Sequence, residues 1–212
     1  MRHISTLDRV IIEVEHGLRT CFVKPPTGAR PYPAEQAQDK EIDEQETRHI
    51  SGLMRVNNAG EVAAQGLYRG QAATARTEQV KRNMLHAAEE ENEHLNWCQT
   101  RLEELGARRS LMDPFWYLGS YAIGFGAGLI GDKWSLGFVE QTEIQVTDHL
   151  QKHLDQLPEQ DQRSERILRQ MKDDEMRHAE NARSAGAADL PKPIQTLMSL
   201  TSKIMTRSAY HI

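Results

Sequence analysis

Twice along this sequence, a glutamate is followed about 30 residues later by the motif Glu-x-x-His. The first copy consists of Glu61, Glu91 and His94, and the second of Glu143, Glu175 and His178. The two glutamates are 30 residues apart in the first copy and 32 in the second. That length fits two consecutive helices joined by a short loop, so the two copies together predict a bundle of four helices.

Apolar residues recur at helical spacing along the chain, and no stretch alternates as a half-buried strand would. We therefore expect an all-α protein with long helices at roughly 47–77, 80–105, 134–157 and 161–185. Residues 1–46 are predicted to form a short amphipathic helix followed by a proline-rich linker. Residues 47–212 are expected to form the main domain, which ends in an amphipathic segment after Pro191.

The repeated glutamates and histidines fall on the apolar faces of these helices. Residues at positions i and i+3 share one face, so Glu91 and His94 can grip the same ion, as can Glu175 and His178. In the third long helix, Glu143 lies in a heptad series with three leucines, whereas Glu140 lies at its margin. Glu143 is therefore the better candidate.

Charges on four core faces would each cost several kcal/mol unless something neutralised them. A single Glu-x-x-His motif is usually a solvated pair, but two copies on core faces favour a pair of divalent cations. One glutamate from each of two helices and Glu-x-x-His from the other two is the pattern of ferritin-like di-iron and di-manganese bundles. Mixed carboxylate and imidazole ligands suit iron or manganese better than zinc.

Three further side chains near these positions have open roles. Tyr68, one heptad after Glu61, either donates a hydrogen bond near the site or simply packs. His149 and His153 flank the apolar face of the third long helix, where they either orient ligands from outside or lie half-exposed at the surface.

An uncharged insert, residues 114–131, separates the second and third long helices. It could be a buried helix crossing the bundle end, a patch dipping into one membrane leaflet, or a true span. We favour a combination of the first two, because a span would put the two halves of the metal site on opposite sides of the membrane. Four aromatic rings suit the headgroup zone, namely those of Phe115, Trp116, Tyr117 and Tyr121. Gly124 and Gly128 would permit close helix approach.

Composition narrows the remaining function classes. The net charge is −5 with both signs mixed along the chain, which argues against a nucleic-acid-binding protein. The only cysteines are Cys21 and Cys98, so we expect reduced thiols and a cytosolic compartment. The charged N-terminus does not have the pattern of a signal peptide.

Four segments together resemble the demethoxyubiquinol hydroxylases of ubiquinone biosynthesis: "LMRVNNAGEVAAQGLYRGQ", "AAEEENEHLNWC", "GFVEQTEIQVTDHLQKHL" and "MKDDEMRHAENA". The resemblance extends from about residue 47 to the end of the chain. The positions that match the family's iron ligands are Glu61, Glu91, His94, Glu143, Glu175 and His178. In that match, Glu61 is a terminal ligand, and Glu91 and Glu175 are bridging carboxylates. His149 stands where the family has a histidine near the site.

The resemblance implies that the chain hydroxylates the ring of a polyprenylated methoxy-methyl-benzoquinol. It implies two Fe2+ ions per chain, O2 as co-substrate and an external reductant. Because the prenyl tail is insoluble in water, we expect peripheral attachment to the cytoplasmic side of the cell membrane through the insert. Homo-oligomers or other ubiquinone-biosynthesis proteins are possible partners. Two rival classes remain: a ferroxidase, iron-storage or peroxide-handling bundle, and a helical membrane-surface scaffold without metal.

Overall fold

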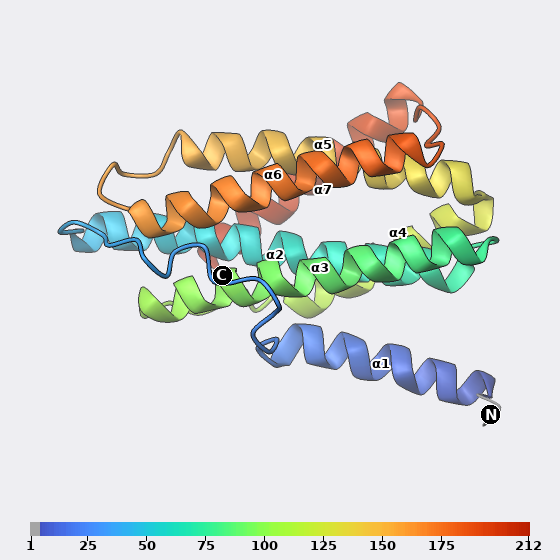
Figure 1. Cartoon of the computed structure of the whole chain (residues 1–212), viewed down its shortest axis with the longest axis horizontal. Helices are drawn as coiled ribbons and strands as arrows, with labels where there is room; N and C mark the ends of the chain where they lie inside the picture. The colour runs from blue at the N-terminus through green and yellow to red at the C-terminus, as the bar shows by residue number, and fades with distance from the viewer. Residues whose placement is uncertain (1–4) are drawn as a thin grey trace.

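The computed structural model describes residues 5–212, and within this range the chain forms seven helices and no strand (Figure 1). The helices are α1 (Thr6–Phe22), α2 (Glu44–Thr74), α3 (Glu78–Glu104), α4 (Asp113–Ile130), α5 (Asp132–Leu154), α6 (Gln162–Ser184) and α7 (Lys192–His211). The predicted all-α fold is confirmed. Two antiparallel hairpins, α2–α3 and α5–α6, make up the four-helix bundle, and α4 is the insert between them.

Local side-chain chemistry explains where the bundle helices begin. Asp43 accepts two backbone N–H hydrogen bonds at the start of α2, and Thr77 and Asp161 cap α3 and α6 in the same way. Only Gly131 separates α4 from α5, and its φ of 143° suits a residue without a Cβ. Each end of these four helices lies within three residues of its predicted position.

The interior of the bundle is divided along its length into two apolar clusters. The first consists of Ala34, Ile50, Met54, Trp97, Cys98, Leu102, Leu150, Ile167, Leu168 and Met171. The second consists of Ala64, Tyr68, Ala72, Val80, Met84, Ala88, Leu136, Val139 and Ala182. Between them, each bundle helix contributes a buried glutamate, and α3 and α6 each add a histidine. We call these six residues the polar layer: Glu61, Glu91, His94, Glu143, Glu175 and His178.

Helix α4 lies lengthwise along α2, and glycines on both helices allow their backbones to touch. A Cβ on Gly124 would collide with the carbonyl of Leu67, and one on Gly70 would collide with that of Tyr121. The predicted close approach at Gly124 and Gly128 is confirmed. The idea that the insert crosses the end of the bundle is wrong, because this contact runs along the length of α2.

The aromatic residues of α4 do not all face outward. Phe115 is 59% exposed, but Trp116 and Tyr117 are only 8% and 3% exposed. Trp116 packs against Ala209 of α7, and Tyr117 packs against Cys21 of α1. Assigning Trp116 and Tyr117 to the headgroup zone was therefore wrong, since both rings fill the space between helices.

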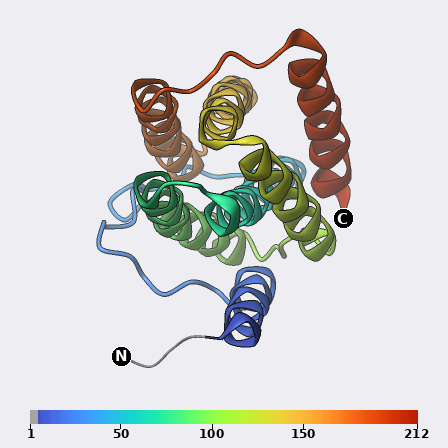
Figure 2. The ribbon, with the colours of Figure 1, turned by 90° about the vertical axis from the view of Figure 1, so that its right-hand side faces the viewer.

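The additional helices α1 and α7 lie on either side of α4 (Figure 2). Residues 23–43, which we call the strap, run from α1 across the bundle to the start of α2 (Figure 1). The strap is anchored by Ala34, which is fully buried in the first apolar cluster. Within residues 5–212, every helix falls short of the length or the apolar character that crossing a membrane requires.

Candidate metal centre

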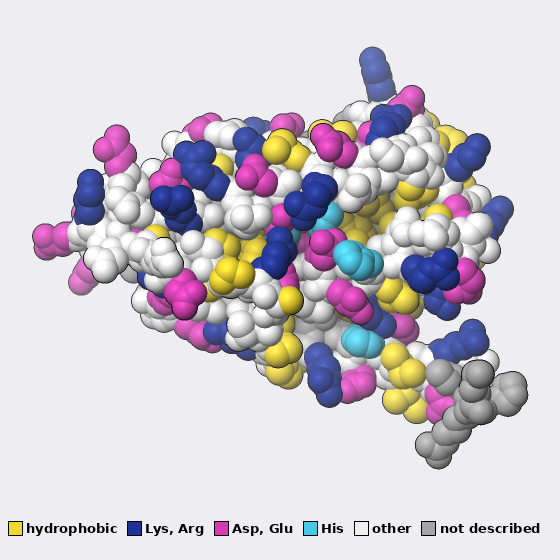
Figure 3. Space-filling view, in the orientation of Figure 1, with side chains coloured by type: hydrophobic (Ala, Val, Ile, Leu, Met, Phe, Trp, Pro, Cys, Tyr) yellow, Lys and Arg dark blue, Asp and Glu magenta, His cyan; other side chains and the backbone are white. Residues whose placement is uncertain are grey.

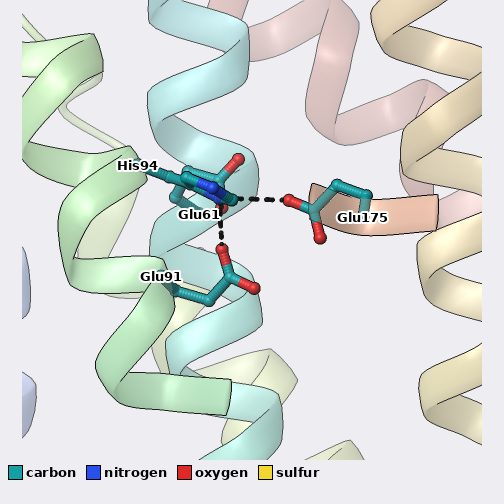
Figure 4. Close-up of side chains that lie close together, drawn as sticks. All are labelled: Glu61, Glu91, His94 and Glu175. Atoms are coloured by element: carbon teal, nitrogen blue, oxygen red, sulfur yellow. Dashed lines mark hydrogen bonds and ion pairs between the residues drawn. The ribbon is translucent and has the colours of Figure 1, made fainter. Parts of the chain in front are cut away.

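The six residues of the polar layer meet in the middle of the bundle, and each is at most 5% exposed. Their oxygen and nitrogen atoms form two clusters, each small enough to surround one metal ion. The first cluster contains Glu61, Glu91, His94 and Glu175, and the second contains Glu143, Glu175 and His178. In Figure 4, Glu175 of α6 points across the bundle toward His94 of α3. Glu175 belongs to both clusters and therefore links them.

Two carboxylates each reach both histidines. One oxygen of Glu91 lies 2.8 Å from Nδ1 of His94, and the other lies 3.3 Å from Nδ1 of His178. Glu175 repeats the arrangement, with its oxygens 3.2 Å and 3.1 Å from the same two nitrogens. Each carboxylate thus reaches both histidines with separate oxygens, although only Glu175 belongs to both clusters.

The other two carboxylates belong to one cluster each. An oxygen of Glu61 lies 3.8 Å from Nδ1 of His94, in the first cluster. Glu143 lies in the second cluster, is 2% exposed, and has one oxygen, Oε1, without a hydrogen-bond partner. A buried carboxylate oxygen without a partner is costly unless a cation satisfies it.

The electrostatics of the polar layer show an excess of negative charge. Burial, followed by the charge of Glu91, raises the pKa of Glu61 well above its usual value. Burial and the charge of Glu175 raise the pKa of Glu143 in the same way. Burial opposes protonation of His178, but hydrogen bonds to Glu175 and Glu91 raise its pKa to about 12. The site therefore favours any positive charge, and two divalent cations would balance its four carboxylates.

A second pair of carboxylates fixes the orientation of the histidine rings from outside. Nε2 of His94 lies 3.0 Å from Oδ2 of Asp174, and Nε2 of His178 lies 3.1 Å from Oε2 of Glu90. A proton on each Nε2 donated to these carboxylates leaves Nδ1 free to bind a metal ion. The donor set and its ring orientations thus fit the two iron ions that the family resemblance implies.

Sequence reasoning missed Asp174 and Glu90, although a signal was present. Each stands directly before the glutamate of a Glu-x-x-His motif, so the repeated unit is an acid followed by Glu-x-x-His. Each of these acids orients the histidine of the opposite hairpin. The contact between hairpins could not be inferred from spacing alone, because an acid at that position on an isolated helix lies off the apolar face.

The other candidate residues lie outside the polar layer. Tyr68 is fully buried and its hydroxyl has no hydrogen-bond partner. His149 is half-buried and lies against His153, with the ring centroids 3.9 Å apart and the ring planes tilted by 59°. It makes no hydrogen bond to the polar layer in the described part of the chain. His153 instead bonds to Asn57, four residues before Glu61. Glu140 lies outside the cluster and pairs with Arg183.

A cavity of about 420 Å³ reaches the polar layer from the surface. His178 and Tyr68 line it, together with the apolar side chains of Met84, Leu136 and Val139. In the space-filling view, hydrophobic atoms are visible in a hollow between α3 and α6 (Figure 3). The candidate metal centre is therefore accessible to a molecule with an apolar part.

A helical bundle with one glutamate on each of two helices, and Glu-x-x-His on each of the other two, defines the class of ferritin-like di-metal carboxylate proteins. The model of one family, described as "Ubiquinone biosynthesis protein COQ7", matches residues 48–209. The chain belongs to this family.

Relatives of nearly equal length share about half of its residues. A protein of Nitrosococcus oceani is 54% identical over 211 residues, covering 100% of this chain and 99% of that protein. One of Xanthomonas euvesicatoria is 53% identical, covering 98% and 95%, and one of Laribacter hongkongensis is 52% identical, covering 97% and 100%. Each of the three is named 3-demethoxyubiquinol 3-hydroxylase.

Proposed function

We propose that this chain is a 3-demethoxyubiquinol 3-hydroxylase, which adds a hydroxyl group to the ring of a polyprenylated methoxy-methyl-benzoquinol. The observation that carries the proposal is the pair of carboxylates, Glu91 and Glu175, that each span both histidines in the core. Full-length similarity to relatives of that name supports the choice of substrate.

In this proposal, the polar layer holds two Fe2+ ions per chain. His94 and His178 would hold the ions through Nδ1, and Glu61, Glu91, Glu143 and Glu175 would hold them through carboxylate oxygens. Bound iron would supply the activation of O2, with electrons from an external reductant. The chain itself fixes the ligands and encloses the centre between the two apolar clusters.

The 420 Å³ cavity is the proposed entrance for the quinol ring. Its apolar walls, including Leu136 and Val139, suit the methyl and prenyl groups of such a ring. The unpartnered hydroxyl of Tyr68 lies at this cavity and can bond to a ring oxygen. We therefore assign Tyr68 to substrate positioning and give His149 no contact with the substrate.

We further propose that the face formed by α1, α4 and α7 lies on the cytoplasmic surface of the cell membrane (Figure 2). Its exposed apolar side chains include Leu7, Val10, Ile11, Val14, Leu18, Phe115, Leu118, Phe125, Leu129, Leu197, Leu200 and Ile204. An apolar face on this scale marks an interaction surface, and a polyprenyl substrate resides in a bilayer. In this proposal residues 47–212 are the catalytic domain, and residues 1–46 add α1 and the strap.

The direct test is to incubate iron-loaded protein with reductant, O2 and a demethoxyubiquinol extract, and then to measure product mass. We expect the mass of one added oxygen atom, and about two irons per chain. The variant His178→Ala should retain the helical circular dichroism spectrum and lose the activity. Many irons per chain without product would instead indicate an iron-storage protein, and full activity of the variant would refute the site.

A further inference from the structure

Given the proposed function, we propose that Arg30 of the strap is a positioning residue for the metal centre. It holds Asp174 in the one orientation in which that carboxylate fixes the ring of His94. Arg30 lies outside residues 48–209, the part of the chain that the family model matches, whereas Asp174 and His94 lie inside it. It predicts that the two metal positions differ in affinity and that the strap sets this difference.

Arg30 of the strap is held against α3. Its backbone N–H and its guanidinium both bond to the carboxylate of Glu93 on α3. The guanidinium lies 4.9 Å above the ring of Trp97, within the range of a cation–π contact. Gly28 lies so close to Glu93 that any Cβ at this position would collide with that side chain. The guanidinium is therefore held by Glu93 and by the ring of Trp97, while its Nη2 has no hydrogen-bond partner among the described residues.

Arg30 contacts Asp174 at the carboxylate oxygen that also bonds to His94. Nη1 of Arg30 lies 2.6 Å from Oδ2 of Asp174, and the same oxygen accepts from Nε2 of His94 at 3.0 Å. The other oxygen of Asp174 accepts from Gln170 and Arg177. Asp174 is fully buried, so these four donors leave its carboxylate one orientation. The ring of Trp97, 5.2 Å from that of His94, limits the ring from a further side.

Within the described chain, no residue of the strap contacts His178 or its outer carboxylate. That carboxylate, Glu90, has a side chain that is 30% exposed. Apart from His178, Glu90 contacts His86, which is 71% exposed, and Arg177 at the limit of 4.0 Å. Glu90 therefore keeps rotational freedom that Asp174 has lost. The two hairpins supply equivalent ligands and each histidine has an outer carboxylate, but the carboxylate at His94 is held by more contacts than the one at His178.

Pre-ordering a ligand strengthens binding, because less side-chain freedom is lost when the ion enters. Changing a residue that orients a metal-binding histidine typically weakens metal affinity by about 10- to 100-fold. We therefore expect the position at His94 to bind metal more tightly than the position at His178. Removing the guanidinium should weaken only the tighter position.

The test uses Co2+, which reports on carboxylate and imidazole ligation through its visible absorption and does not need O2. Metal-free wild-type protein titrated with Co2+ should show two binding steps of unequal affinity. Arg30→Gln should weaken the tighter step about 10-fold or more and leave the weaker step unchanged. In Arg30→Lys, the Co2+ affinity of the tighter step should lie between those of the wild type and Arg30→Gln. One ammonium group cannot hold both Glu93 and Asp174.

A matched control separates this contact from general docking of the strap. Asp39 anchors the other part of the strap, through Arg101 at 2.7 Å and the backbone N–H of Arg163 at 3.0 Å. Asp39→Asn should loosen that anchor and leave both Co2+ affinities as in the wild type. Asp174→Asn should weaken the same step as Arg30→Gln, and the double variant should add little to either.

The outcomes distinguish the two proposals. A wild-type protein that binds fewer than two Co2+ ions refutes the metal centre and with it the proposed function. Two ions in the wild type, with unchanged affinities in a folded Arg30→Gln variant, refute the role of Arg30 alone. The same holds if Asp39→Asn weakens binding as much as Arg30→Gln, or if Arg30→Gln weakens both steps equally.

Discussion

At the scale of single residues, the interior of this bundle contains ionisable groups that could bind metal ions and that oppose folding of the metal-free chain. Glu143 is the clearest case, because burial raises its pKa and one of its oxygens has no partner. A chain without metal must therefore fold around a carboxyl group that would be better solvated in the unfolded state.

Glu143→Gln should accordingly have opposite effects on the two forms. The metal-free variant should be more stable than metal-free wild type at neutral pH, by about 1–3 kcal/mol, because position 143 no longer buries a carboxyl group whose ionisation is opposed. Its iron content should fall below two per chain. Urea unfolding in the presence of a chelator, together with iron analysis, measures both effects. A variant that loses stability and keeps its iron would show that Glu143 is an ordinary core residue.

Asp113, at the start of α4, gives a dependence of stability on pH. Burial raises its pKa to about 7, partly offset by Arg109 and by a hydrogen bond from Asn58. The native state therefore keeps its proton while the unfolded state ionises from its usual value near 3.8. The stability associated with Asp113 is fully present below about pH 4 and is lost as the pH rises to about 7.

Asp113→Asn should remove this loss. Across that pH window we expect the wild type to lose on the order of 3 kcal/mol from this group, and the variant to lose correspondingly less. Denaturant unfolding at pH 5 and pH 8 measures the difference. Parallel pH profiles for the two proteins would contradict the assignment.

The limits of sequence reasoning are also clearest at single residues. The six side chains of the polar layer could be predicted, because helical periodicity places them on apolar faces and the repeat pairs them. Arg30 could not, because the strap has no periodicity and the reach of its side chain depends on the path of the chain across α3. His149 shows the opposite limit, since its position in the sequence suggested a contact that the structure does not record.

At the scale of elements, the four long helices could be predicted because each has a clear apolar face and most begin at a capping side chain. The path of α4 could not. Its 18 residues include no charge after Asp113, so no polar face marks which side meets the bundle. Its glycines indicate a close approach, but a sequence does not state which helix is approached.

The contact between α2 and α4 can be tested with two glycines of the same helix. Gly124→Ala should destabilise the protein by about 1–3 kcal/mol, because the new methyl group would meet the backbone of Leu67. Gly119→Ala, where nothing lies within 4 Å, should stabilise it by up to about 1 kcal/mol through helix propensity. Thermal unfolding of both variants gives the comparison. Equal effects would mean that α4 does not pack in this way.

At the scale of the whole molecule, α1, α4 and α7 give the protein one apolar side, whereas α5 and α6 lie on another side of the bundle (Figure 2). Phe115 and Leu118 are 59% and 67% exposed on α4, so they can be changed without disturbing the core. Trp116 cannot, since it packs beneath α7. The distinction decides which variant tests membrane binding and which merely damages the fold.

Replacing Phe115 and Leu118 together with serine should reduce cosedimentation with vesicles of phosphatidylethanolamine and phosphatidylglycerol about tenfold or more, while iron content stays unchanged. The matched control replaces Ile144 and Met176, exposed apolar residues of α5 and α6, with serine. This control should bind vesicles as the wild type does. Loss of binding in both double variants, or in neither, would count against the proposed face.

Each hairpin supplies half of the candidate metal-binding side chains in the polar layer. Among the four bundle helices, packing is closest within each hairpin, and the polar layer lies where α2–α3 meets α5–α6. Ions bound there would hold the two hairpins together through ligands from both. Without iron, the contact between the two hairpins should therefore loosen first. Amide hydrogens on either side of the polar layer should then exchange before the outer turns of the helices unfold.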